Sequence, residues 1–151
     1  MAGFRAWRKL SENHGGYVTV DLDARIGSTL SGDVDKIDEV ENVAGGKGDD
    51  TLTGATGANV LTGDIGEDYV DGLPGADRLY GGSSADVVVA RDSTRNERVS
   101  CGRGKDLAII NRGDDVVRRG ANRCEQVDNG RQTKPRPGWI RLRRRRSTRK
   151  W

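Results

Sequence analysis

The sequence predicts an all-β solenoid, in which short strands stack coil upon coil around a narrow core. Three observations carry this prediction. Five consecutive nonamers run without a gap over residues 45–89, and glycine accounts for 22 of the 151 residues. A third is the apolar content of 33%, because ordinary globular domains contain roughly 45–50% apolar residues. Such a chain cannot fill a thick two-layer core, whereas stacked repeats can line single aliphatic side chains into a column.

Three columns of the nonamer agree in every repeat. Position 1 is glycine at Gly45, Gly54, Gly63, Gly72 and Gly81. Position 6 is Asp50, Asn59, Asp68, Asp77 and Asp86, and position 8 is Leu52, Leu61, Val70, Leu79 and Val88. The alternative interpretation, a flexible acidic linker, gives no reason for this agreement.

Within one nonamer, the residue types predict a turn followed by a short strand. Gly and Asp dominate positions 1–6, and glycine adopts positive φ angles without steric cost. Positions 7–9 are rich in Thr, Val, Leu and Tyr, which favour extended backbone. Because neighbouring side chains of a strand point to opposite faces, position 8 faces one way and positions 7 and 9 face the other.

The pattern Gly-Gly-x-Gly-x-Asp-x-aliphatic-x resembles the hemolysin-type calcium-binding (RTX) nonapeptide, and residues 45–53 match it at every defined position. The resemblance implies a right-handed parallel β-roll in which two nonamers make one turn. It also implies that Ca²⁺ lies between successive turns, bound by position 6 carboxylates and by carbonyls of the glycine-rich loops. The chemistry agrees, since calcium takes about six to eight oxygen ligands and stacked carboxylates repel one another without a cation.

The resemblance also implies which residues hold the metal. If repeats i and i+2 share an edge, Asp50, Asp68 and Asp86 stack on one side, and Asn59 and Asp77 stack on the other. The glycines expected to contribute carbonyls or loop geometry are Gly45, Gly46, Gly48, Gly63, Gly66, Gly72 and Gly75. We expect about two to three ions, with the Asp50/Asp68 site the strongest. Weaker sites are expected where Ala55, Asp64, Leu73 and Ser84 replace glycine.

The resemblance continues upstream of the repeats. Residues 1–16 read as a polar N-terminal segment, and residues 17–44 are expected to form an N-terminal β cap. Within this cap, the alternation of apolar and polar residues over 17–22 predicts a strand, and residues 27–35 are expected to form a polar loop. Residues 40–45 resemble the coil that leads into such repeats, with Val43 at position 8.

Downstream, residues 90–100 are expected to be a loop insertion and residues 101–128 degenerate closing coils. In these coils Asp106 and Asp115 take position 6 as weak metal ligands. Ala108 and Val117 take position 8. The closing cysteines, Cys101 and Cys124, resemble the paired ending of some extracellular members, which implies a disulfide and an oxidising compartment. Two free buried thiols are the alternative.

The sequence predicts no catalytic residues and no enzyme activity. Ser11 and His14 lie close together but lack a third partner and an oxyanion loop. The acid pairs at 49–50 and 114–115 each contain one member that the repeat already explains. No apolar run approaches the ~20 residues needed to span a bilayer, and the first 14 residues lack the apolar stretch of a signal peptide.

The formal net charge of +3 combines two parts of opposite sign. Residues 1–130 hold 16 Lys and Arg against 23 Asp and Glu, whereas residues 131–151 hold 10 Lys and Arg and no acid. This basic tail is expected to be a disordered, solvated end, and the alternative is contact with an anionic partner. Besides calcium ions, the expected partners are anionic cell-envelope or surface polymers, with nucleic acid less favoured.

These observations point to an extracellular bacterial module, secreted or on the cell surface, that folds when Ca²⁺ binds and has a structural or surface-binding role. Two alternatives stay open. The chain could be the accessory calcium-binding domain of a secreted protease, lipase or glycosidase whose catalytic part lies outside it. It could also bind polyanions through its arginine-rich tail. The sequence sets no oligomeric state.

Overall fold

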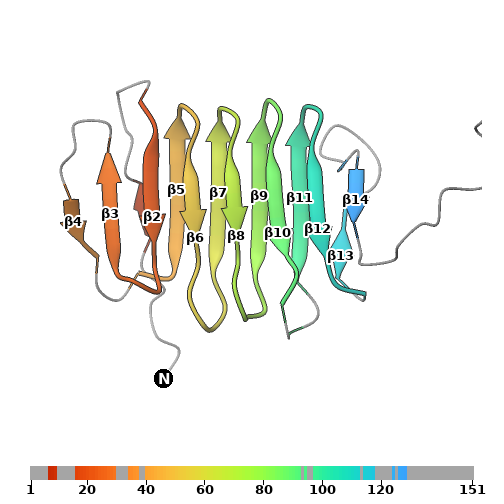
Figure 1. The fold of residues 1–151 in the computed structure, drawn as a ribbon, viewed down its shortest axis with the longest axis horizontal. Helices are drawn as coiled ribbons and strands as arrows, with labels where there is room; N and C mark the ends of the chain where they lie inside the picture. Colours follow the sequence, from red (N-terminus) through yellow and green to blue (C-terminus); the bar gives the residue numbers. More distant parts are fainter. Residues whose placement is uncertain are drawn as a thin grey trace, which may run out of the picture.

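The computed structural model describes residues 7–9, 16–29, 34–37, 40–92, 94, 97–112, 114–117, 124 and 126–128. All regular structure in this part of the chain is β-strand. The strands form two facing sheets, and the chain passes from one sheet to the other as it advances along the axis (Figure 1). This arrangement confirms the predicted parallel β-roll. The predictions for residues 129–151, for Ser11 and for His14 concern positions outside the described residues.

The two sheets differ most at the N-terminal end. The first contains, in spatial order, β1 (Trp7–Lys9), β5 (Asn42–Lys47), β7 (Val60–Ile65), β9 (Arg78–Ser83), β11 (Arg98–Arg103) and β13 (Asp115–Val116). The second contains β14 (Gln126–Asp128), β12 (Leu107–Ile110), β10 (Val87–Ala90), β8 (Tyr69–Asp71), β6 (Thr51–Thr53), β2 (Val18–Asp21), β3 (Ile26–Thr29) and β4 (Val34–Lys36). Pairing is parallel except between β2 and β3 and between β3 and β4.

The core is the stacked column of position 8 side chains. All five residues predicted for this column are 0% exposed, and they are Leu52, Leu61, Val70, Leu79 and Val88. Strand register explains the stacking, because Leu61 pairs with Leu79 in the first sheet and Leu52 pairs with Val70 in the second. One aliphatic side chain for each strand is therefore enough, which accounts for the low apolar content of the chain.

The turns between the sheets stack so closely that they require positive φ angles. A Cβ on Gly66, whose φ is +140°, would stand 1.9 Å from the carbonyl oxygen of Gly48 in the turn before. Four described residues other than glycine have positive φ angles, and the largest are those of Asp64 at 91° and Ser84 at 96°. Side chains at such angles cost roughly 1–2 kcal/mol, so these two departures from the glycine pattern carry backbone strain.

We expect Ser84→Gly to raise the free energy of unfolding by about 1 kcal/mol, because glycine relieves this strain. The neighbouring Ser83→Gly should lower it by about 0.5–1 kcal/mol, since Ser83 ends β9 without a positive φ and glycine there only adds freedom to the unfolded chain. Urea unfolding in saturating Ca²⁺ measures both changes. Equal shifts in the two variants would contradict the strain at residue 84.

The N-terminal cap contains more strand than the sequence predicts. Strand β2 pairs with β6 in parallel, as a cap that continues the roll requires. The predicted loop over 27–35 is wrong in part, because β3 and β4 extend the second sheet as an antiparallel hairpin. The small residues Gly27 and Ser28 lie in β3, and β3 and β4 follow β2 at the end of the second sheet.

The C-terminal coils change length. Strand β11 pairs Val99 with Leu79, and β13 pairs Val116 with Val99. Val116 is therefore the buried member of the core column, and the prediction of Val117 at position 8 is wrong by one residue. For the same reason Asp115 does not take position 6, since its exposed side chain pairs with Arg98 at 3.4 Å. The expected place of Ala108 is confirmed by its pairing with Val88.

A disulfide closes the last coils. Cys101 and Cys124 are joined, with their Cα atoms 5.0 Å apart, and both are buried. This confirms the predicted pairing against the alternative of free thiols. None of the described residues belongs to a helix that is long and apolar enough to cross a membrane.

Candidate metal centre

Four aspartates stack along one edge of the roll, each at the start of a strand of the second sheet. Asp50, Asp68, Asp86 and Asp106 are at most 2% exposed. The Oδ1 atom of each accepts a backbone N–H from the turn before. For example, Asp50 N donates to Asp68 at 2.8 Å and Asp68 N donates to Asp86 at 3.0 Å. The ladder thus connects each turn to the next.

The second carboxylate oxygen of each ladder aspartate has no such partner. The Oδ2 atoms of Asp50, Asp68, Asp86 and Asp106 are buried and find no hydrogen-bond donor among the described residues. A buried polar atom left in this state costs roughly 1–3 kcal/mol, and more when it is charged. The edge therefore presents a row of desolvated anionic oxygens that a cation would stabilise.

Backbone carbonyls converge on the same oxygens. Asp50 Oδ2 and Gly63 O lie 2.1 and 2.9 Å from the point where a Cβ on Gly45 would stand. The same arrangement recurs with Asp68 Oδ2 and Gly81 O beside Gly63, and with Asp86 Oδ2 and Cys101 O beside Gly81. Glycine at position 1 thus leaves room where a carboxylate and a carbonyl of the next turn meet. Paired hard oxygens of this kind fit Ca²⁺.

Side-chain ligands alone do not complete a site. Within the part of the chain that the structure describes, no three His, Cys, Asp or Glu side chains gather as metal ligands. A cation on this edge must therefore take most of its oxygens from the backbone or from water. This requirement explains why acids recur singly, one for each loop, and why glycine surrounds them.

Burial dominates the electrostatics of the ladder. It raises the pKa of Asp50 and of Asp68 to about 6, although the accepted backbone N–H bond opposes the shift in each case. Burial likewise raises the pKa of Asp86 to about 7, with neighbouring carboxylates adding to the effect. Burial disfavours the charged form of each carboxylate. Proton binding and metal binding both remove this penalty, so protons and metal ions compete for the same groups.

These pKa values predict opposite effects of pH in chelator and in calcium. Carboxyl groups whose pKa is higher in the folded state bind more protons there, so the stability of the roll in chelator should fall as pH rises from about 4 to about 7. In Ca²⁺, lowering the pH over the same range should weaken metal binding, because protons compete for the ligands. Circular dichroism against pH, with and without Ca²⁺, measures both trends. The same direction of change with pH in chelator and in Ca²⁺ would contradict the assignment of these aspartates as metal ligands.

The second edge is weaker in charge. Hydrogen bonding at Asp77 follows the same rule, with Asn59 N donating to Asp77 Oδ1 at 2.8 Å. Burial raises the pKa of Asp77 to about 7, and its Oδ2 has no donor among the described residues. The amide of Asn59 is instead engaged, since its Oδ1 accepts from Ala55 N and its Nδ2 donates to Glu41 O. The Asn59 side chain therefore forms structural hydrogen bonds and contributes no charge to the second edge.

The other predicted glycines shape the loops. Gly46, Gly48 and Gly66 have positive φ angles of 125°, 109° and 140°. A Cβ on Gly75 would stand 1.9 Å from Gly57 O. A Cβ on Gly54 would stand 2.4 Å from Gly72 O and 2.8 Å from Asn59 Oδ1. The predicted site residues of the repeats are thus brought together on two edges, and Asp106 extends the first edge.

Two acids on the second edge escape the repeat pattern. Because Arg98 pairs with Arg78 and with Asp115, Glu97 follows Asp77 and Asp114 follows Glu97. Glu97 is 0% exposed. A nine-residue phase cannot find these positions, since the coils that contain them are longer or shorter than two nonamers. The only feature of the sequence that indicates these two positions is an acidic residue directly before an apolar strand.

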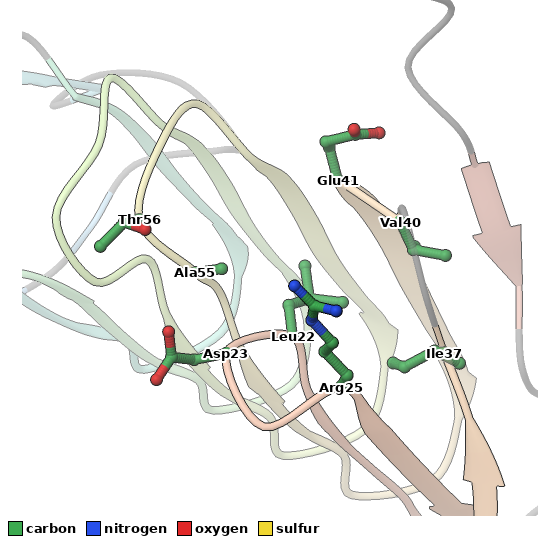
Figure 2. A pocket seen from close by; sticks show the side chains of 8 residues that line it. All are labelled: Leu22, Asp23, Arg25, Ile37, Val40, Glu41, Ala55 and Thr56. Atoms are coloured by element: carbon green, nitrogen blue, oxygen red, sulfur yellow. The ribbon is translucent and has the colours of Figure 1, made fainter.

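A separate hollow lies beside the start of the second edge. Its volume is about 360 Å³, and it is lined by Leu22, Asp23, Arg25, Ile37, Val40, Glu41, Ala55 and Thr56. Figure 2 shows Arg25 reaching into this hollow beside Leu22, with Asp23 and Glu41 on different sides of it. The hollow is thus lined by both apolar and charged side chains, and it does not include the stacked aspartates.

Comparison with known proteins agrees with this geometry. The family model described as RTX calcium-binding nonapeptide repeat (4 copies) matches residues 44–79 and, again, residues 62–92. Comparison with curated proteins and with solved structures gave no significant match. The matched residues contain the aspartates Asp50, Asp68 and Asp86 and both glycine-rich edges.

Proposed function

Because residues 44–92 are RTX calcium-binding nonapeptide repeats, we propose that the chain is an extracellular module whose β-roll folds on binding Ca²⁺. The observation that supports this most directly is the row of buried Oδ2 atoms that lack a donor among the described residues. Calcium would bind these oxygens together with the carbonyls of the next turn. The module is structural, and its own residues perform no catalysis.

The ligand assignment follows the convergence of oxygens. We assign one ion to Asp50 with the carbonyl of Gly63, and a second to Asp68 with the carbonyl of Gly81. A third would lie between Asp86 and the carbonyl of Cys101. The first two take their carbonyl from a glycine at position 1 of the next turn, whereas the third takes it from Cys101, so the first two should bind most tightly, in agreement with about two to three ions. Asp77 and Asp106 are the further carboxylates on the two edges.

Calcium binding supplies the free energy that the small core lacks. Each ion relieves a desolvated carboxylate and ties a loop to the next turn. The ion binds the folded chain only, so its binding free energy adds to the stability of the roll. In chelator, the aligned charges and the narrow apolar column should leave the repeats largely unfolded.

The proposed location is extracellular or on the cell surface. The disulfide between Cys101 and Cys124 supports this, since disulfides persist in oxidising surroundings. A module that needs Ca²⁺ would stay unfolded where calcium is scarce and fold where it is abundant. A structural or surface-binding role, toward anionic envelope polymers for instance, fits a solenoid of stacked coils.

Far-UV circular dichroism of the full chain tests the proposal. We expect a coil-like spectrum in chelator and a β-rich spectrum in about 1 mM Ca²⁺, near the weak end of extracellular affinities. Mg²⁺ at the same concentration is the control, because it demands a tighter octahedral site and gives up water reluctantly. A β-rich spectrum in chelator, or a coil-like one in Ca²⁺, would overturn the proposal.

A further inference from the structure

The long coil before β11 brings together acceptors that the nonapeptide does not contain. Strand register places Glu97 directly after Asp77 on the second edge, and Asp114 directly after Glu97. Asp92 and Thr94 belong to the same coil. These residues lie outside the assigned repeat ligands, so their arrangement needs its own explanation.

Thr94 is the centre of the cluster. Its Oγ1 lies 2.5 Å from Asp92 Oδ1, 2.6 Å from Glu97 Oε1 and 2.9 Å from Gly75 O. A hydroxyl group has a single proton, so it can donate to only one of these three acceptors. The other two acceptor oxygens therefore lie close to Thr94 Oγ1 without receiving its proton.

Further oxygens of the cluster lack any donor. Glu97 is 0% exposed, yet its Oε2 has no hydrogen-bond partner among the described residues, and the same holds for Asp92 Oδ2 and Asp114 Oδ1. Asp114 is joined to the same loop through Asn111, which donates its N–H to Asp114 Oδ2 and its Nδ2 to Thr94 O. Burial raises the pKa of Glu97 above its ordinary value, and the neighbouring Asp114 carboxyl adds to the shift. A buried acid and a half-buried acid on neighbouring turns repel each other unless a proton or a cation lies with them.

We propose that this cluster binds one divalent cation, Ca²⁺, which closes the C-terminal end of the second edge. Its carboxylate ligands are Glu97 and Asp114, and its neutral ligands are the Thr94 hydroxyl and the Gly75 carbonyl. The donor set is all oxygen, which selects calcium over metals that prefer nitrogen or sulfur. Two carboxylates with neutral oxygens also agree with the absence of three clustered acidic ligands among the described residues.

Neighbouring contacts hold these ligands in place. Asp92 Oδ1 accepts Thr94 N at 2.5 Å, and Asp114 Oδ2 accepts Asn111 N at 2.6 Å. Asn111 Nδ2 donates to the carbonyls of Asp92 and Thr94, both at 3.0 Å. The ion would therefore join three successive loops, those of Gly75, Thr94 and Asp114, where the repeat pattern has ended.

Ion counting on the full chain tests this site. Native mass spectrometry at saturating Ca²⁺ should show one ion fewer for Glu97→Gln and for Asp114→Asn than for the wild type. The β-rich circular dichroism spectrum in Ca²⁺ should persist in both. Asp115→Asn is the matched control, because this neighbouring aspartate is exposed and pairs with Arg98, and its ion count should equal that of the wild type.

An unchanged ion count in Glu97→Gln and Asp114→Asn would overturn the site and indicate that the two acids share a proton instead. Asp114→Asn is the milder change, since its amide oxygen can still accept the Asn111 N–H, so it decides the matter if Glu97→Gln does not fold. Failure of the wild type to bind any Ca²⁺ would contradict the proposed function as well. Loss of the repeat ions alone would leave this site standing.

Discussion

Asp68→Asn should weaken calcium binding about tenfold or more and, in chelator, make the roll easier to fold. The two effects have opposite signs because the carboxylate is favourable with the ion and unfavourable without it. Asp68 is 2% exposed, burial raises its pKa to about 6, and its Oδ2 finds no donor among the described residues. At a pH of about 7.5, above that pKa, the folded chain must keep this group charged and desolvated unless Ca²⁺ is bound.

Asparagine preserves the rest of the interaction. Its Oδ1 can still accept the Asp50 N–H, which the wild-type carboxylate accepts at 2.8 Å. Its amide nitrogen would stand where Asp68 Oδ2 now lies, on the side of Gly63 where Gly81 O also lies, and a carbonyl is a suitable acceptor for an amide nitrogen. Asn59 shows that an amide is compatible with position 6, because both of its polar atoms are hydrogen-bonded. The variant therefore removes a charge without removing the ladder.

Asp68→Asn must be compared with the wild type both in Ca²⁺ and in chelator. Calorimetric titration gives the loss of affinity, since the number of ligand charges tunes calcium affinity over decades. In chelator, the concentration of sucrose needed to fold half of the chains should be lower for the variant, because excluded osmolytes favour compact states. Glu67→Gln is the control, an equal charge change at an exposed neighbour. Destabilisation by Asp68→Asn in chelator would contradict the buried-charge argument.

The sequence predicts the regular part of this molecule because one physical period governs it. A turn of two nonamers brings residue i beside residue i+18, as the bond from Asp50 N to Asp68 shows. Hence the inward column and the acidic ladder could be located by counting alone. Counting also places Asn59 and Asp77 on the opposite edge, where the structure has them.

The same counting fails where coil length changes. Glu97 takes the place after Asp77 through a coil of 20 residues, the separation that also links Asp86 N to Asp106. The following coil is shorter, so Asp114 and Val116 replace the expected Asp115 and Val117. Loop lengths are set by local closure and by contacts such as those of Thr94, which leave no periodic trace. A periodic pattern in one sequence therefore cannot predict these changes in coil length.

Leu61→Ala should lower the free energy of unfolding in saturating Ca²⁺ by about 2–5 kcal/mol, whereas Ile65→Ala should change it by less than about 1 kcal/mol. Both residues belong to β7 and lose similar apolar volume. Leu61 is 0% exposed and pairs with Val43 and Leu79 in the core column. Ile65 is 51% exposed, so its truncation opens no cavity.

The contrast tests how the two sources of stability combine. A column of single aliphatic residues has no second layer to collapse into the space left by Leu61, so the cavity cost should be near the upper part of the range. Calcium would then hold the edges of a roll whose centre is incomplete, and the Ca²⁺ concentration needed for folding should rise with Leu61→Ala alone. Urea unfolding at fixed Ca²⁺ and circular dichroism against Ca²⁺ measure these effects. Equal costs at the two positions would mean that the ions, and not the column, stabilise the roll.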